Sequence, residues 1–467
     1  MAKSFAEYVS GGALRLGVTG LSRAGKTVFI TALVKNLVAN ARLPVLKASA
    51  EGRIARAYLE PQPDDAVPRF AYEDHCAALA GKDRHWPQST RRISQMRVTI
   101  EFERARGWGN RASRLALDIV DYPGEWLLDL PLLAKTFAQW SRETLAACEG
   151  PARAPLAAEW LSFVGGLDPT AHADEETARK AASLFTAYLR KARDDTYALS
   201  TLPPGRFLMP GDLEGSPALT FAPMRVEESA IGPASSLGAM MERRYESYKA
   251  HVARPFFRYH FARLDRQIVL VDALAALNSG PAAVRDLENA LAEVLQAFRA
   301  GRASRFATMF RPRVDRILFA ATKADHLHHR SHDRLEEILR LLTARAIARA
   351  EGVGAKIDVI ALAAIRATRE AQIRQGGETL DAIIGVPEAG ERLGDQVFDG
   401  NSEAAVFPGE LPKDPNAVFA GQTIGLEQAE VDWRFLRFRP PLVAPGASPP
   451  QIRLDRALQF LIGDRLA

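Results

Sequence analysis

Eight consecutive residues near the start of the chain, "GLSRAGKT" from Gly20 to Thr27, fit the pattern G-x-x-x-x-G-K-[ST]. A loop of this kind wraps backbone N–H groups around phosphate oxygens, while its lysine reaches the outer phosphates and its hydroxyl ligates Mg²⁺. Such a short pattern can arise by chance, so its context decides. The sequence predicts a strand before the loop (Leu14 to Thr19) and a buried helix after it (Lys26 to Asn40), which is the context that a phosphate site requires.

A carboxylate and a glycine follow a second predicted strand, in "LALDIVDYPGEW". The strand Leu115 to Val120 ends at Asp121, which we expect to hold a metal-bound water. Gly124 lets a backbone N–H approach the γ-phosphate, as in the D-x-x-G pattern of GTPases. Asp118, on the same strand, is the alternative carboxylate, or an outward-facing strand residue.

A third motif, "TKAD", ends the predicted strand Ile317 to Ala321. It resembles the [NT]-K-x-D motif of GTPases, in which the aspartate, here Asp325, pairs with the N1–H and N2 amino groups of guanine while the lysine stem, here of Lys323, covers the ring. Adenine lacks this pair of donors, so a buried carboxylate selects against ATP. After the next predicted strand, Ala363 and Ala364 lie where GTPases place an S-A-x loop whose backbone touches guanine, although serine is absent here.

The segment between Thr27 and Asp121 is long for a first switch and therefore contains an insertion. Within "HWPQSTRRIS", Thr90 is the best candidate for a threonine that closes over Mg²⁺ and the γ-phosphate, with Ser89 and Ser94 as competitors. A structural alternative is that this loop only packs and Thr90 faces solvent.

Five segments give the chain a family resemblance: "GLSRAGKTVFITALV", "WPQSTRRIS", "DYPGEWLLDLPLL", "YKAHVARPFFRYHFARLDRQIVLVDAL" and "FAATKADHLHHRSHDRLE". In this order, over residues 14 to about 370, the chain resembles the YcjX-like family of bacterial P-loop proteins, GTPases or ATPases. The resemblance implies a cytosolic nucleotide-binding protein, often encoded beside a membrane protein of the YcjF type and linked to envelope or heat stress. It implies no substrate beyond the nucleotide.

Two side chains are candidates for assisting hydrolysis. Glu125 follows the D-x-x-G motif where small GTPases often carry glutamine, and a carboxylate beside a triphosphate predicts slow or partner-dependent turnover. Arg23 occupies a loop position that resembles the G-x-x-R-x-G-K-S loop of guanylate-binding and atlastin-type GTPases, where the arginine is an internal finger. Such an arginine accelerates hydrolysis by roughly 10³ to 10⁵. The alternative is that Arg23 faces solvent or pairs with a neighbouring carboxylate.

Two further clusters carry no function in this interpretation. The histidines between His326 and His332 follow the base-binding loop without a cysteine or a carboxylate set to complete a metal site, so we expect them to cap the next helix. The segment Asp432 to Pro441 mixes arginine with phenylalanine, and its alternation predicts an edge strand rather than a nucleic-acid surface.

Composition limits the cellular setting. The net charge is +5 without long runs of one sign, so no nucleic-acid partner is expected. Two cysteines are too few for a disulfide framework and fit a reducing cytoplasm. The sequence contains neither a secretory signal nor a transmembrane segment, so we expect a cytoplasmic protein whose membrane contact is peripheral or through a partner.

The expected fold is α/β, a GTPase-like P-loop domain with a mostly parallel sheet and a large inserted helical lobe. We assign residues 10–130, 265–368 and 431–467 to the P-loop domain, 131–264 to the lobe, and 369–430 to a mobile excursion rich in Gly and Pro. The expected activity is a Mg²⁺-dependent GTPase switch that binds GTP and GDP; the alternatives are an ATPase and a nucleotide-stabilised scaffold that docks a membrane protein. The expected nucleotide contacts are Gly20, Ser22, Arg23, Ala24, Gly25, Lys26, Thr27, Val28, Thr90, Gly124, Lys323, Asp325, Ala363 and Ala364, with Thr27, Thr90 and Asp121 on the metal and Arg23, Lys26 and Glu125 in catalysis.

Overall fold

The structure is a computed structural model in which contacts divide the chain into two compact units. The first unit comprises residues 1–122, 264–278 and 312–467, and the second comprises 123–263 and 279–311. The structure describes residues 13–21, 23–62, 64–88, 90, 92–105, 112–194, 196–226, 232–296, 314–352, 354–375, 377–420, 435–444 and 446–467.

A mostly parallel sheet of seven described strands forms the centre of the first unit, in the order β2-β3-β4-β1-β5-β6-β7. The five strands from β4 to β7 in this order are parallel, and β3 is antiparallel to both of its neighbours. The expected α/β fold is therefore confirmed. The strands are β1 (Leu14–Gly20), β2 (Ile54–Glu60), β3 (Ser94–Glu103), β4 (Ala112–Asp121), β5 (Arg266–Val271), β6 (Arg316–Ala321) and β7 (Lys356–Ala361).

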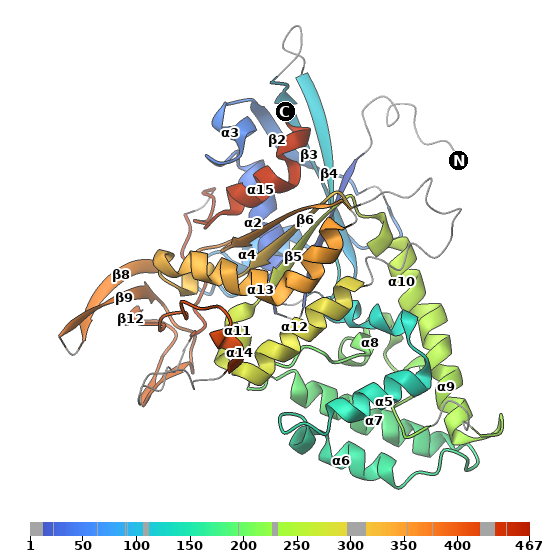
Figure 1. Cartoon of the computed structure of the whole chain (residues 1–467). Coiled ribbons are helices and arrows are strands. Elements are labelled where there is room, and N and C mark those ends of the chain that lie inside the picture. The colour runs from blue at the N-terminus through green and yellow to red at the C-terminus, as the bar shows by residue number, and fades with distance from the viewer. Residues whose placement is uncertain are drawn as a thin grey trace. The chain divides into compact units, whose positions relative to one another are not determined.

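Helices α2 (Lys26–Val38) and α15 (Leu454–Ile462) pack with the sheet in one apolar core (Figure 1). The strands can be apolar throughout, because strands covered on both faces have no solvent side; every residue of β5 is buried. Helix α13 (His332–Glu351) packs against β6 and β7. The shorter helices of this unit are α3 (Lys47–Ala50), α4 (Tyr72–Ala78), α11 (Ala273–Asn278) and α14 (Ala417–Ala420), with the 3₁₀ turns η9 (Ala324–His326), η10 (His329–Ser331) and η11 (Gly463–Arg465).

The segment expected to be an excursion contains regular structure. Strands β8 (Arg369–Gln375), β9 (Glu378–Gly385) and β12 (Ala404–Val406) form an antiparallel sheet, and β10 (Arg392–Leu393) pairs with β11 (Gln396–Val397). A small apolar cluster that includes Ile383 and Phe438 packs there.

The predicted edge strand at 432–441 is wrong over its described part. Residues 435–441 contain only an isolated bridge between Phe438 and Pro387. Pro440 and Pro441 cannot donate to a sheet, and Phe438 is buried in the small cluster of the β8–β9 sheet rather than beside the main sheet. Residues 432–434 lie outside the described part of the chain.

The second unit is helical in its described residues and comprises 123–263 and 279–311, whereas the lobe predicted from the sequence comprises 131–264. It also includes α12 (Pro281–Gln296), which the sequence analysis assigned to the P-loop domain. Stacked aromatic rings, including Trp140 on Tyr245 and Trp160 on Tyr188, fill its core. Its other helices are α5 (Phe137–Ala147), α6 (Ala154–Gly165), α7 (Glu175–Ala192), α8 (Gly205–Leu208), α9 (Leu237–Tyr248) and α10 (Arg254–Tyr259), with a π-helical turn η5 (Lys249–Ala253) and 3₁₀ turns η1 (Gly124–Asp129), η2 (Pro131–Ala134), η3 (Gly211–Leu213), η4 (Pro217–Leu219) and η6 (Phe261–Arg263).

Side-chain capping fixes where several of these helices begin. Thr136, Asp174 and Ser236 accept a hydrogen bond from the amide three residues later, at the starts of α5, α7 and α9. No helix in the described part of the chain is long and apolar enough to cross a membrane.

Candidate functional site

The G-x-x-x-x-G-K-T loop connects β1 to α2 in the first unit. Strand β1 ends at Gly20 and α2 begins at Lys26. Gly25 is the residue before the helix and has φ of 81°, a conformation that glycine adopts without strain. Arg23 is exposed and has φ of 63°, which for a residue with a Cβ costs roughly 1–2 kcal/mol. The loop is thus held in a conformation that the arginine itself does not favour.

Lys26 is buried with its ammonium group turned back over the loop. Its Nζ donates to the carbonyl oxygens of Gly20 at 3.0 Å and Leu21 at 3.3 Å. An α-helix leaves the amides of its first turn without acceptors inside the helix, and here that turn comprises Lys26, Thr27 and Val28. A cation beside a helix N-terminus is a site for an anion such as phosphate. Ala24 is buried below the loop, and Ser22 lies outside the described residues.

Three side-chain oxygens meet beside this lysine. Thr27 Oγ1 and Thr90 Oγ1 are 3.2 Å apart, and Thr90 Oγ1 donates to Asp121 Oδ2 at 2.5 Å. Thr27 is the second residue of α2, Thr90 precedes β3, and Asp121 ends β4, so the sheet brings together residues that are far apart in sequence. Of the two competitors of Thr90, Ser94 opens β3 and Ser89 lies outside the described residues.

Asp121 is a buried carboxylate whose charge is incompletely compensated. Burial raises the pKa of its carboxyl group to about 6, against the opposing effects of the Lys26 charge and the hydrogen bond from Thr90. Its Oδ1 is buried and makes no hydrogen bond to the described residues. Hard cations such as Mg²⁺ take oxygen ligands and keep several waters, so a carboxylate oxygen without a protein donor beside two hydroxyls fits the Mg²⁺ that this class of loop implies.

Asp118, the alternative carboxylate, has a structural partner. Arg97 on the neighbouring strand donates from Nε to Asp118 Oδ1 at 2.6 Å and from Nη2 to Oδ2 at 2.8 Å. The two residues are directly paired across β3 and β4. Both oxygens of Asp118 are therefore used in a bidentate ion pair inside the sheet.

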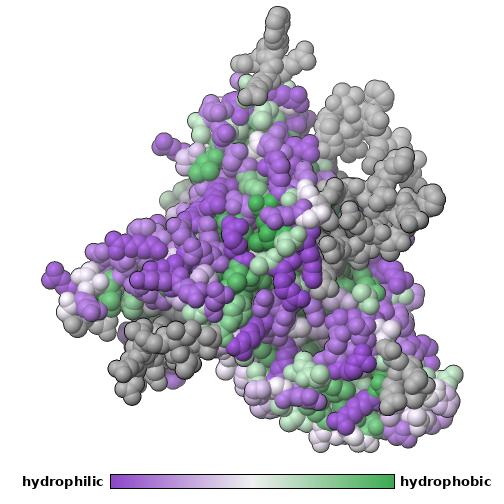
Figure 2. Space-filling view, viewed as in Figure 1, coloured by the Kyte–Doolittle hydropathy of each residue, from purple (hydrophilic) through white to green (hydrophobic). Residues whose placement is uncertain are grey.

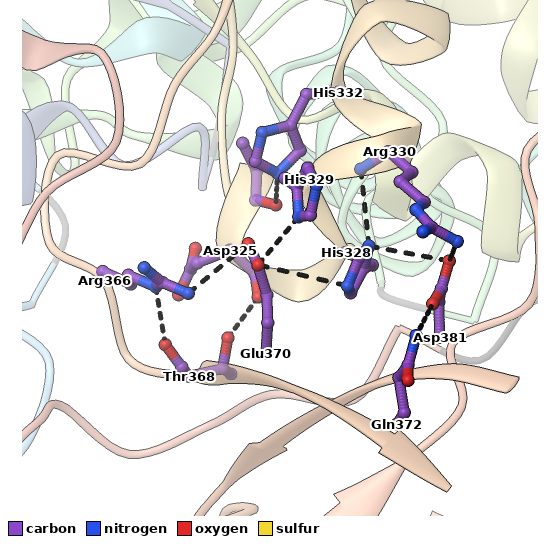
Figure 3. Close-up of polar contacts among 11 residues, drawn as sticks. Asp325, His328, His329, Arg330, His332, Arg366, Thr368, Glu370, Gln372 and Asp381 are labelled. Atoms are coloured by element: carbon purple, nitrogen blue, oxygen red, sulfur yellow. Dashed lines mark hydrogen bonds and ion pairs between the residues drawn. The ribbon is translucent and has the colours of Figure 1, made fainter.

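The T-K-A-D segment follows β6. Asp325 is 4% exposed, and its Oδ2 accepts a hydrogen bond from the Ala367 amide at 2.8 Å. The Thr368 hydroxyl donates to the backbone oxygen of Asp325 (Figure 3). Lys323 has φ of 60°, and its Nζ pairs with Asp272 Oδ2 at 2.5 Å. The aspartate and the lysine are thus both held in place by residues from other loops.

Asp272, Ala367 and Thr368, which contact Lys323 or Asp325, are not among the residues predicted from the sequence. Asp272 directly follows β5. Its position at the carboxyl end of a buried parallel strand could have marked it as a candidate, because ligands bind at that edge of a parallel sheet. The amide of Ala367 and the hydroxyl of Thr368 gave no motif.

Of the two residues predicted to contact the base through their backbone, Ala363 and Ala364, the first has its amide engaged elsewhere. The amide of Ala363 donates to Ile452 O at 3.1 Å, and its carbonyl accepts from the Ile452 amide at 2.8 Å. A contact from the Ala363 amide to a base would therefore require this bridge to open. Ala364, which is partly buried against the main core, remains the candidate.

Gly124 and Glu125 belong to the second unit, where they begin the 3₁₀ turn η1. Glu125 is buried, and its Oε1 accepts from Arg193 Nη1 at 3.0 Å. The carboxylate therefore has an ion-pair partner at the end of α7 within its own unit.

The histidine segment differs from the interpretation given above. His332 Nε2 contacts Ala324 O at 2.8 Å and His326 packs on Phe438, which agrees with a structural role for these two residues. His328 and His329, however, are grouped with Glu370 of β8. The expectation that no carboxylate set completes a site did not take Glu370 into account, because this carboxylate comes from a strand about forty residues further along the chain.

A parallel sheet, a phosphate loop at the end of β1 and a lysine turned over that loop define a P-loop nucleoside triphosphatase fold. Comparison with known proteins identifies the family: the chain matches the YcjX-like family, DUF463, over residues 14–466, and it belongs to that family. The chain is 40% identical to "Ras-like GTPase YcjX" of Escherichia coli, over 97% of this chain and 96% of the relative. It is 34% identical to "Ras-like GTPase YcjX" of Shewanella oneidensis, over 97% and 94%.

Proposed function

We propose that this protein binds GTP with Mg²⁺ and hydrolyses it, and that its two nucleotide states act as a switch. The observation that carries the proposal is the group of oxygens from Thr27, Thr90 and Asp121 beside the buried Lys26. The names of the two relatives support guanine as the base. In the proposed complex, Lys26 and the first-turn amides of α2 bind phosphate, while Thr27, Thr90 and Asp121 hold Mg²⁺ directly or through water.

Asp325 is the residue that we propose to select guanine. Its carboxylate is buried and is oriented by the Ala367 amide, so it is placed before the nucleotide arrives. A carboxylate accepts from both N1–H and the N2 amino group of guanine, and each hydrogen bond to a charged group contributes about 1.5–3 kcal/mol. Loss of both contacts should weaken GDP binding by roughly 10²–10⁴-fold.

Substitution of Asp325 by asparagine tests the choice of base. An amide presents one donor and one acceptor, so Asp325→Asn should lose GDP affinity and gain affinity for XDP, whose C2 carbonyl accepts a hydrogen bond. The asparagine oxygen can still accept from Ala367, which preserves the loop. Affinities are measured by calorimetric titration with GDP, ADP and XDP.

Asp333→Asn is the matched control, because this exposed carboxylate lies near the start of α13 and outside the proposed base contacts. It should bind GDP as wild type does. Tighter binding of ADP than of GDP by the wild-type protein would contradict the guanine assignment, as would an Asp325→Asn variant with an unchanged preference.

We propose in addition, from the family resemblance, that the protein works in the cytoplasm, at the inner membrane through a partner of the YcjF type, during envelope or other stress. A switch requires a partner that distinguishes the two states, since a ligand with equal affinity for both shifts nothing. Partner affinity should therefore differ between GDP and a non-hydrolysable GTP analogue. Equal affinities would favour a nucleotide-stabilised scaffold instead.

A further inference from the structure

A second group of ligand-type side chains lies between the start of α13 and the β8–β9 hairpin. His328 and His329 come from the turn before α13, and Glu370 projects from β8 toward both rings (Figure 3). One ligand atom from each of the three side chains lies within 4.8 Å of the other two. On the face drawn in Figure 2, the side chains over α13 and the hairpin are mostly hydrophilic. The side chains of His329 and Glu370 are 60% and 30% exposed, so an ion can reach them from water.

The spacing of these atoms suits a small tetrahedral metal ion. His328 Nε2 and Glu370 Oε2 are 4.0 Å apart, which is too long for a hydrogen bond. Two ligands at about 2.0–2.1 Å from a tetrahedral zinc ion are roughly 3.3–3.4 Å apart. His329 Nδ1 is 2.8 Å from the same carboxylate oxygen. The ligand atoms of the two histidines are no more than 4.8 Å apart, so side-chain shifts of up to roughly 1.4 Å would place all three atoms around one ion.

A carboxylate lies near the second nitrogen of His328, at a distance that a hydrogen bond would have to shorten. Nδ1 of His328 is 3.7 Å from Asp381 Oδ2. A histidine that ligates through one nitrogen usually directs the other N–H to a carboxylate, which fixes the ring. The Arg330 amide also approaches this Nδ1, at 3.5 Å, and calls for the opposite tautomer. Ligation through Nε2 would place the proton on Nδ1 and so select the contact with Asp381.

Glu370 directs one carboxylate oxygen toward the two histidines. Its Oε1 is 3.5 Å from Arg366 Nη2, whereas Oε2 faces the two histidines. A glutamate carboxyl group is ordinarily ionised at neutral pH, so Glu370 can act as an anionic ligand.

We propose that His328, His329 and Glu370 bind a divalent metal ion of the zinc class, with water in the fourth position and Asp381 as the acceptor for His328. Two imidazoles and one carboxylate are a ligand set that zinc uses when it keeps an open position. This site is separate from the Mg²⁺ site of the proposed function, whose ligands are oxygens only, and the proposal does not depend on GTP binding.

Bound metal would link the turn η10 to strand β8. These two segments adjoin the ones that hold Asp325, because Asp325 lies in the η9 turn before η10 and its partners Ala367 and Thr368 lie just before β8. An ion that binds the folded protein better than the unfolded chain raises the stability of the fold. Zinc should therefore raise the thermal midpoint of the metal-free protein.

Calorimetric titration of chelator-treated full-length protein with ZnCl₂, in excess Mg²⁺ and without nucleotide, tests the site. We expect one zinc ion per chain and a higher thermal midpoint. Affinity should fall at least about tenfold in His328→Ala and Glu370→Gln, and also in Asp381→Ala, which removes the acceptor. Co²⁺ in place of zinc should give visible absorption bands that His328→Ala alters.

His85→Ala is the matched control, because this exposed histidine of the first unit lies outside the group of His328, His329 and Glu370. It should bind zinc like wild type. Circular dichroism and GDP affinity establish that each variant is folded. The proposal is overturned if wild type takes up no zinc at equimolar concentration, or if the folded His328→Ala and Glu370→Gln variants bind it as tightly as wild type.

Discussion

Substitution of Asp121 by asparagine should raise stability and weaken Mg²⁺-dependent nucleotide binding, two effects of opposite sign. Burial raises the pKa of the Asp121 carboxyl from 3.8 to about 6. The folded protein therefore binds this proton more tightly than the unfolded chain does. The resulting contribution to stability is fully present below the unfolded-state pKa and is lost as the pH rises through the folded-state pKa. The difference between the two pKa values corresponds to about 3 kcal/mol.

The neutral asparagine avoids the free-energy cost of burying an ionised carboxylate. At about pH 7.5 the nucleotide-free Asp121→Asn variant should be more stable than wild type by up to about 3 kcal/mol. The advantage should shrink as the pH falls from about 6 to about 4, because the wild-type carboxyl is then increasingly protonated. Thermal unfolding over this pH range measures the effect.

The same variant should bind GTP with Mg²⁺ at least about tenfold more weakly, because a charged contact worth about 1.5–3 kcal/mol is lost. In wild type, protonation of the same carboxyl should lower the Mg²⁺ affinity about fourfold between pH ~7.5 and pH ~5.5. Titration of Mg²⁺ at a fixed GTP concentration measures both.

Asp118→Asn provides the matched control on the same strand. It removes the bidentate partner of Arg97 and should destabilise the protein by about 3 kcal/mol, with the Mg²⁺ affinity within about twofold of wild type. If Asp121→Asn loses stability as Asp118→Asn does, the argument from its buried charge is refuted. If its Mg²⁺ dependence is unchanged, the metal assignment is wrong.

Two further substitutions separate catalysis from structure. Arg193→Ala leaves the buried Glu125 without its ion-pair partner and should lower the free energy of unfolding by about 2 kcal/mol. The double variant with Glu125→Gln should recover most of this loss. An Arg193→Ala protein as stable as wild type would contradict the structural role of this ion pair. Arg23→Ala should slow single-turnover GTP hydrolysis by about 10³-fold or more if Arg23 is an internal finger, whereas a rate within a few-fold of wild type removes that role.

The main sheet could be predicted from the sequence because its signals are local. Each motif follows a short apolar run, and the carboxyl ends of parallel strands meet at one edge of a sheet. The strand before Gly20 was expected at Leu14 to Thr19 and is found at Leu14–Gly20. The helix expected after the phosphate loop, from Lys26 to Asn40, is α2, Lys26–Val38.

The neighbours of these motifs could not be predicted, because they depend on contacts between distant segments. Lys323 is paired with Asp272, which lies 51 residues earlier. Asp325 accepts from Ala367, which lies 42 residues later and contributes only its backbone. Glu370 reaches His329 because the β8–β9 hairpin packs beside the start of α13. A backbone amide and a single glutamate form no sequence motif, so these contacts cannot be predicted from the sequence alone.

Part of the local cost in the first unit falls on residues of its motifs, although Asn40 and Arg453, which lie outside them, also have positive φ. Arg23 and Lys323 both adopt a left-handed backbone conformation that residues with a Cβ avoid, and Asp121 is an ionisable group with a carboxyl pKa raised by burial. Each arrangement lowers stability by an amount that a glycine or a neutral side chain would avoid. Such conflicts between local preference and fold are expected where a site must be held ready for a ligand. A phosphate ligand that contacts Lys26, with Mg²⁺ on Asp121, would compensate the buried charge of this carboxylate. The same carboxylate can therefore be unfavourable in the nucleotide-free protein and required in the complex.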